Sequence, residues 1–170
     1  DNVIYADRYS VTTAGGKKFA VAISASGVDG IRLEGLAIQP SAWTDQRYVK
    51  AGYFNGCASL SLVDVEASFF SRAAGVFEID DCDDFLAERL SVRKCWTVST
   101  LNASGSAISS VEAQVSGLVV DANAAAGSAR GRVIDSTFED LTVSQAVKAA
   151  VGYQTDGISL LGRNAVKPNA

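Results

Sequence analysis

The sequence predicts an all-β solenoid that forms a single domain, and three observations lead to this fold class. An apolar pattern recurs about every 25 residues, each copy contains short segments of alternating apolar and polar residues, and no segment shows convincing helical periodicity. Alternation with a period of two is typical of β-strands. One copy is too short to bury its own apolar side, so we expect about seven copies to stack as coils along residues 1–170.

Each copy predicts three short strands, two of which surround an anchor residue. Apolar residues stand at offsets −5, −3, 0 and +2 from the anchors Leu36, Val65, Leu90 and Leu118, and at −3, 0 and +2 from Leu141. Weaker copies at the two ends have Tyr9 and Leu161 as anchors. A polar pair such as Glu34-Gly35 or Glu88-Arg89 interrupts the pattern and predicts a bend between the two strands. A further apolar run upstream of the anchor predicts the third strand, at 19–23, 51–54, 75–79, 106–108, 132–134 and 151–153.

This repeat resembles the coils of the right-handed parallel β-helix in the pectin-lyase-like superfamily, which includes pectate lyases, polygalacturonases and bacteriophage tailspikes. The resemblance covers nearly the whole chain, and it rests on periodicity and columns of similar residues instead of a catalytic motif. It implies a right-handed parallel β-helix in which the coils form the scaffold and inserted loops carry function. A β-sandwich is the alternative fold, but its strands would recur about every 8–12 residues, whereas the pattern here recurs about every 25 residues.

Composition narrows the function classes. The net charge is −4 and the pI is about 4.8, which argues against nucleic acid as a partner. No apolar stretch reaches about 18 residues, so we expect no membrane insertion. Histidine is absent, which excludes histidine-based catalytic triads and most zinc or iron sites. We predict no cofactor, and the start at Asp1 without any methionine suggests a section of a longer chain.

Stacked coils bring residues at equal offset together. One column places Cys57 over Cys82, which we interpret as two buried free thiols, with a disulfide as the alternative. Another column aligns Asp84, Glu112 and Asp135 on successive coils. Three such carboxylates could bind Ca²⁺ or act as an acid–base pair, but we favour the simpler interpretation that they are polar residues of the coil corner.

Other equal offsets predict contacts between neighbouring coils. Asp64 would pair with Arg89, and Arg93 with Asp121, as exposed ion pairs. Cys95 follows its strand at the same offset as Phe70, so these two side chains should pack together.

Aromatic residues gather after two of the predicted strands. The longest insertion, 39–52, and the segment 93–100 each carry a tryptophan, and a phenylalanine pair lies on the coil between them. Rings stack on the apolar faces of sugars while polar groups bind hydroxyls, so the candidate ligand-binding residues are Trp43, Asp45, Arg47, Tyr48, Phe70 and Trp96. Contact with another subunit and plain packing against the core remain alternatives.

The sequence and its resemblance favour a tailspike-like protein of a virion or cell surface. It would bind surface polysaccharide or another glycan, or serve as a structural stalk, as a homotrimer or another homo-oligomer. A polysaccharide lyase or glycoside hydrolase is the second hypothesis, and a purely homo-oligomeric assembly domain is the third. The non-catalytic function is preferred because no set of residues matches a catalytic motif of the family.

Overall fold

The computed structural model describes residues 3–6, 10–12, 18–40, 49–70, 75–97, 115–123, 130–151 and 155–163. Within these ranges the chain is almost entirely β-structure, which confirms the predicted all-β class. The strands are β1 (Val3–Ala6), β2 (Ser10–Thr12), β3 (Lys18–Ser26), β4 (Arg32–Glu34), β5 (Ala37–Pro40), β6 (Val49–Asn55), β7 (Ser61–Val63), β8 (Glu66–Ser68), β9 (Phe77–Asp80), β10 (Phe85–Glu88), β11 (Ser91–Thr97), β12 (Val115–Asn123), β13 (Gly131–Ile134), β14 (Thr137–Val143) and β15 (Thr155–Arg163). One helix, α1 (Gln145–Val151), follows β14.

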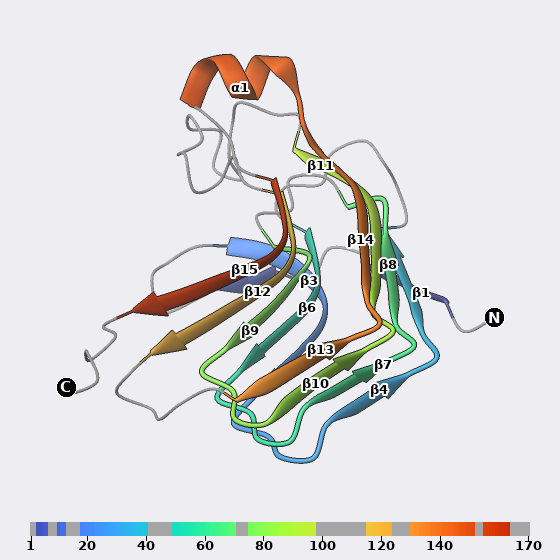
Figure 1. Ribbon diagram of the computed structural model, residues 1–170, viewed down its shortest axis with the longest axis vertical. Coiled ribbons are helices and arrows are strands. Elements are labelled where there is room, and N and C mark those ends of the chain that lie inside the picture. The colour runs from blue at the N-terminus through green and yellow to red at the C-terminus, as the bar shows by residue number, and fades with distance from the viewer. Residues whose placement is uncertain are drawn as a thin grey trace.

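The strands form three sheets that the chain visits in rotation (Figure 1). The six-stranded sheet has the order β15-β12-β9-β6-β3-β2, the four-stranded sheet β13-β10-β7-β4, and the five-stranded sheet β1-β5-β8-β11-β14. All pairings are parallel except that of β2 with β3. Three strands per passage agree with the prediction for the repeats anchored at Leu36, Val65 and Leu90, whereas the predicted strand at 106–108 lies outside the described residues and Val151, expected in a strand, ends α1.

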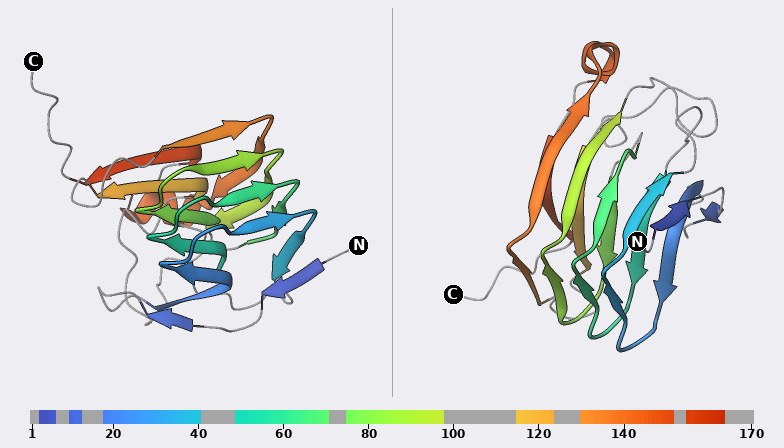
Figure 2. Two further views of the ribbon diagram at one scale, coloured as in Figure 1. Left: turned by 90° about the horizontal axis from the view of Figure 1, so that it is seen from below. Right: turned by 90° about the vertical axis from the view of Figure 1, so that its right-hand side faces the viewer.

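Successive passages of the chain lie one above another, as Figure 2 shows. Within the described residues the complete passages are β3–β5, β6–β8, β9–β11 and β12–β14, while β15 begins another and β1 ends an earlier one. Fewer complete coils are therefore described than the seven we expected. Two repeats that we assigned to separate coils, anchored at Leu118 and Leu141, belong to the single passage β12–β14.

A column of left-handed residues makes the corner between the four-stranded and five-stranded sheets. Gly35, Asp64, Arg89 and Asp135 have φ angles of 64°, 52°, 51° and 49°. Their backbones are neighbours, because the amide of Gly35 donates to Val63 O and the amide of Asp64 to Glu88 O. Glycine adopts this conformation without steric cost, and aspartate tolerates it better than apolar residues do. The bends predicted at Glu34-Gly35 and Glu88-Arg89 are thus confirmed, and Asp64 makes the same bend between β7 and β8.

The core lies between the three sheets and is filled by one face of each. Phe54 and Ile79 come from the six-stranded sheet, Leu62 from the four-stranded sheet and Val92 from the five-stranded sheet, and all are essentially inaccessible. The same side chains alternate with outward ones along each strand, as the period of two requires.

Cys57 and Cys82 are stacked at the corner that follows the six-stranded sheet. The backbone N–H of Cys57 donates to Cys82 Sγ over 3.3 Å, and both cysteines are buried free thiols. Burial raises the pKa of the Cys82 thiol to about 11. The predicted stacking and the predicted free state are both confirmed, and thiols of this kind are poor nucleophiles.

The predicted register is wrong after β11. We expected Leu118 over Leu90, but Leu118 pairs with Phe77 in the six-stranded sheet. The strand that pairs with β10 on the side away from β7 is β13. The amide of Leu90 accordingly donates to the Oγ of Ser136, which is 46 residues later in the sequence. The physical reason is a change in spacing, since β11 ends at Thr97 and β12 begins only at Val115. Alternation alone does not distinguish a strand of one sheet from a strand of another.

Helix α1 was not expected from the sequence. It begins after Ser144, whose Oγ accepts from the amide of Val147 over 3.4 Å and whose carbonyl accepts from the amide of Lys148. Serine at this position satisfies a backbone donor that the first helical turn leaves open. The buried side chain of Val147 joins the core cluster.

Candidate functional site

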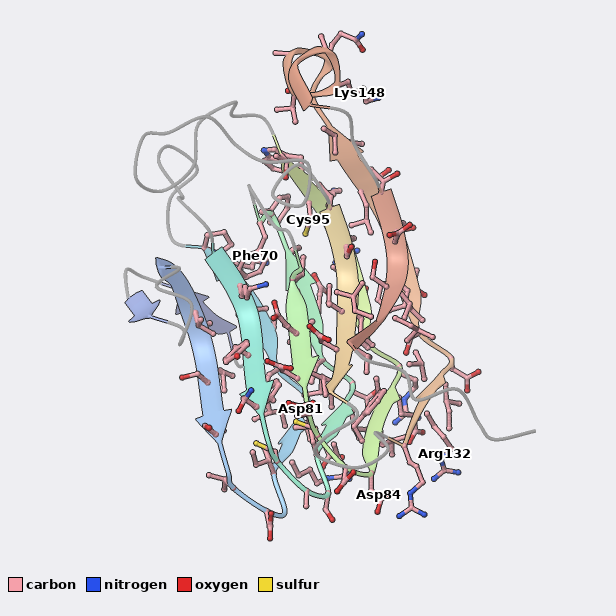
Figure 3. All side chains as sticks on the ribbon, turned by 90° about the vertical axis from the view of Figure 1, so that its left-hand side faces the viewer. Phe70, Asp81, Asp84, Cys95, Arg132 and Lys148 are labelled. Atoms are coloured by element: carbon pink, nitrogen blue, oxygen red, sulfur yellow. The ribbon has the colours of Figure 1, made fainter. Side chains whose placement is uncertain are left out.

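The outer face of the six-stranded sheet carries a network of polar side chains. On β6 and β9 the inward residues Phe54 and Ile79 alternate with outward polar residues. Figure 3 views the molecule from this side, with Asp81 labelled just beyond β9. We define the polar face by the residues that meet there: Lys50, Tyr53, Asn55, Glu78, Asp80 and Asp121.

Asp80 lies at the centre of the polar face. Asn55 Nδ2 donates to Asp80 Oδ2 over 3.0 Å, and Tyr53 Oη donates to the same oxygen over 3.2 Å. The parallel register places Asn55 directly beside Asp80 and Tyr53 beside Glu78. Because both donors bind the same oxygen, Oδ2, they hold the Asp80 carboxylate in a defined orientation.

Lys50 and Glu78 form the second contact of the polar face. Lys50 Nζ lies 2.5 Å from Glu78 Oε2 and also donates to the carbonyl of Gly75 over 3.1 Å. The Lys50 side chain is buried, whereas Glu78 is partly exposed. The ammonium group balances the charge of Glu78, so the net negative charge of the face is concentrated at Asp80 and Asp121.

Proximity of these acids affects their protonation. Burial raises the pKa of the Asp80 carboxyl above its usual range, and the negative charges of Asp121 and Asp81 add to this effect. Asp121 is its register partner on β12 and is almost inaccessible. Burial, helped by the charges of Asp80 and Glu78, raises the pKa of Tyr53 to about 12, so its hydroxyl remains a donor at neutral pH. The face therefore combines a carboxyl group with a raised pKa, a phenol and an amide.

Asp84 and Asp135, two members of the predicted carboxylate column, do not stack on each other. Asp84 has a left-handed φ of 51° at the corner shared with Gly30 and Ser59, and its Oδ1 lies 3.4 Å from Arg130 Nε. Asp135 lies at a different corner, where the amide of Arg89 donates to the carbonyl of Ile134. Asp84 and Asp135 are thus polar corner residues, as the simpler interpretation held. The third member, Glu112, lies outside the described residues.

No calcium site is located either. Among the described residues, no group of three or more aspartate, glutamate, cysteine or histidine side chains has an arrangement that could hold a metal ion. Bound calcium stays a prediction without a site.

The predicted ligand-binding residues fall into two groups. Trp43, Asp45, Arg47 and Tyr48 lie outside the described residues. Phe70 is fully buried in the core cluster, so its ring is not an exposed surface for a sugar, which corrects the prediction for this residue. Trp96 is partly exposed on β11, where its amide donates to the carbonyl of Phe70 over 2.9 Å.

The contacts predicted between coils have mixed outcomes. Arg89 and Asp64 form the expected ion pair, with Nε to Oδ1 at 2.6 Å. Arg93 instead pairs with Glu66 at 2.7 Å, because Asp121 lies on a strand of another sheet. Cys95 and Phe70 are neighbours as expected, since the amide after Cys95 donates to the carbonyl of Phe70.

Sequence reasoning missed the polar face, although part of the signal was present. Tyr53 and Glu78 are 25 residues apart, as are Asn55 and Asp80, and this is also the spacing of Val65 and Leu90. The same offset applied to the upstream strands would have brought these four side chains together. Asp121 could not be added in this way, because the spacing changes before β12.

Comparison with known proteins finds no match to any family model, to any curated protein or to any solved structure. The described part of the chain contains no helix with the length and apolar character needed to cross a membrane.

Proposed function

We propose that this chain is a right-handed parallel β-helix of the pectin-lyase-like kind and that its polar face binds a polysaccharide or another glycan. The rotation of the chain through three parallel sheets supports the helical winding. Crossovers between parallel strands are right-handed in about 98% of cases, which supports the hand. The setting that we propose is a tailspike-like protein of a virion or cell surface, in homo-oligomeric form.

The arrangement of Tyr53, Asn55 and Asp80 is the observation that carries the glycan proposal. A partly exposed ring lies beside a carboxylate and an amide that are already oriented by mutual hydrogen bonds. Sugars need such a combination, because rings cover their apolar faces while fixed donors and acceptors replace water at the hydroxyls. Three parallel sheets provide a rigid support for this face, which limits the entropy lost on binding.

A binding assay with single-site variants tests this proposal. The protein is titrated calorimetrically with a panel of soluble neutral and acidic polysaccharides, and at least one should bind. Asp80→Ala and Tyr53→Ala should each weaken that binding about tenfold, since a lost hydrogen bond to a charged group is worth about 1.5–3 kcal/mol.

Glu139→Gln is the matched control. Glu139 is an exposed carboxylate of β14 in the five-stranded sheet, so this change should leave glycan binding unaltered. The proposal fails if no polysaccharide of the panel binds, or if the polar-face variants bind as tightly as the control.

Glycan cleavage is the second candidate function, and the neighbouring carboxyls of Asp80 and Asp121 favour it. A glycoside hydrolase needs one carboxyl that keeps its proton and a second one nearby that is ionised. The raised pKa of Asp80 is consistent with the first role, and its register partner Asp121 is the neighbouring carboxyl. Release of reducing ends from a bound polysaccharide, abolished by Asp80→Asn, would support a hydrolase. Ultraviolet absorbance of unsaturated uronides would instead support a lyase.

A further inference from the structure

One peptide bond at the end of β6 has a sequence that is prone to spontaneous modification. Asn55 is followed by Gly56, and this is the single Asn-Gly pair in the chain. In such a pair the backbone nitrogen of glycine can attack the side-chain carbonyl carbon of asparagine, because glycine has no Cβ to hinder the approach. Gly56 is exposed, has a left-handed φ of 58° and has no atom near an added Cβ. Water therefore has access to this peptide.

The neighbouring passages hold the same peptide from both sides. The carbonyl of Asn55 accepts from the amide of Gly27 over 2.9 Å, and the amide of Gly56 donates to the carbonyl of Asp80 over 2.9 Å. Attack requires this peptide to rotate toward the Asn55 side chain, so both backbone hydrogen bonds have to break first.

The leaving group of the reaction is held as well. Asn55 Nδ2 donates to Asp80 Oδ2 over 3.0 Å, and the parallel register places Asn55 directly beside Asp80. Asp80 thus holds the attacking nitrogen of Gly56 through its backbone carbonyl and the leaving nitrogen of Asn55 through its carboxylate.

We propose that Asn55 is a latent deamidation site that the pairing of β6 with β3 and β9 keeps closed, with Asp80 as the positioning residue. When this pairing opens locally, the Gly56 nitrogen forms a bond to Asn55 Cγ and the bond from Cγ to Nδ2 breaks. The proton of the Gly56 amide leaves with the Nδ2 group as ammonia, and a cyclic imide remains. Water then cleaves the imide, either between Cγ and the Gly56 nitrogen to give aspartate, or at the Asn55 backbone carbonyl to give isoaspartate.

Either product would weaken the pairing that had protected the site. Both replace a neutral amide that donates to Asp80 by a carboxylate, which is repelled by the Asp80 carboxylate. Isoaspartate also adds a methylene group to the backbone just before Cys57, whose amide donates to Cys82 Sγ. The inference rests on these contacts and does not depend on the proposed glycan binding.

Peptide mapping by mass spectrometry tests the proposal, since deamidation replaces NH2 by OH and changes the mass of the peptide that contains Asn55. The unaltered protein is incubated at mildly alkaline pH, either folded or unfolded in urea. Asn55 should react at least about tenfold more slowly in the folded protein. As mild urea is added, the reaction should accelerate in parallel with hydrogen exchange of the Gly56 amide, because both need the same local opening.

Variants of Asp80 test its positioning role in the folded protein. Asp80→Ala removes the acceptor of Asn55 Nδ2 and should accelerate the reaction about tenfold, the effect of losing one hydrogen bond to a charged group. Asp80→Asn keeps an acceptor oxygen and should react nearly as slowly as the unaltered protein. Glu139→Gln changes an exposed carboxylate of β14 and should leave the rate unaltered.

Circular dichroism establishes that each variant is folded before its rate is compared. Equal rates of Asn55 deamidation in the folded and the unfolded unaltered protein would overturn the proposal. An unchanged or slower reaction in folded Asp80→Ala would also overturn it, because Asp80 would then either play no part or assist the departure of ammonia.

Discussion

Residues 18–97 and residues 115–163 are built from the same kind of strand, yet they differ in spacing and in burial. In the first region β4, β7 and β10 follow at 29 and 25 residues, and side chains such as Phe54, Phe77 and Leu90 are fully buried. In the second region the residues of β13 that pair with β10 come 46 residues later in the sequence. Here Phe138 on β14 is partly exposed and Leu160 on β15 is largely exposed.

The difference shows what each passage contributes to its neighbours. A passage between two others has both edges paired and its inward residues covered, whereas β13, β14 and β15 each have one edge that no described strand pairs. Among the described strands, we therefore expect stability to be greatest in the middle of the stack and lowest at β13–β15. The following predictions test this contrast, beginning with the largest expected effect.

Phe77→Ala and Phe138→Ala compare equal truncations in the two regions. Phe77 is fully buried on β9, so its loss should reduce the free energy of unfolding by about 3–5 kcal/mol. Phe138 is partly exposed on β14, and the loss there should be clearly smaller. Guanidinium unfolding monitored by circular dichroism measures both values. Equal losses would mean that β13–β15 are as well packed as the middle of the stack.

Gly117→Ala tests a close contact that joins β12 to β14. A Cβ at this position would lie 2.3 Å from the Phe138 ring and 2.9 Å from the carbonyl of Gly157. Since the second contact is backbone, we expect a loss of about 1–3 kcal/mol in the free energy of unfolding.

Gly30→Asn is the matched control for this glycine. Gly30 has a left-handed φ of 71° with no atom near a Cβ, and Ser59 and Asp84 adopt the same conformation at the neighbouring corners. Asparagine tolerates this conformation, so the change in unfolding free energy should be small. A larger loss for Gly30→Asn than for Gly117→Ala would contradict this account.

Asp80→Asn tests the protonation of the polar face. The folded-state pKa of this carboxyl is raised above its unfolded value, so the folded protein binds the proton more tightly than the unfolded chain does. The contribution of Asp80 to stability is thus most favourable below the unfolded pKa and declines as pH rises through the folded pKa.

This effect is measured by the melting temperatures of the unaltered protein and of Asp80→Asn between about pH 3 and pH 8. The melting temperature of the unaltered protein should fall relative to that of Asp80→Asn as pH rises, because the amide stays neutral and still accepts from Tyr53 and Asn55. Parallel curves for the two proteins would show that Asp80 does not titrate abnormally.

Arg89→Gln should have the smallest effect. Its guanidinium pairs with Asp64 at the exposed corner of the regular region and also contacts Glu88. Exposed ion pairs contribute little because water and salt screen them. A small decrease in melting temperature should therefore appear in dilute buffer and vanish in molar salt. A decrease that survives high salt would indicate a packing role for this side chain.

Much of the regular region could be predicted from the sequence because its information is local. Alternation at Leu60, Leu62, Phe85 and Ala87 specifies strands that bury one face, and Gly35 marks a corner that needs a left-handed backbone. A constant offset of 25 residues then stacks Cys57 on Cys82 and pairs Asp64 with Arg89.

Only the tertiary structure decided the register beyond Thr97 and the composition of the polar face. Strands of different sheets share the same alternation, so Val115–Asn123 looked like a neighbour of β10 although it pairs with β9. Backbone hydrogen bonds select among such partners, and that selection depends on the lengths of the connections and on the packing of side chains such as Phe138 against Gly117. The meeting of Asp121 with Asp80 follows from that selection, and no local pattern in the sequence specifies it.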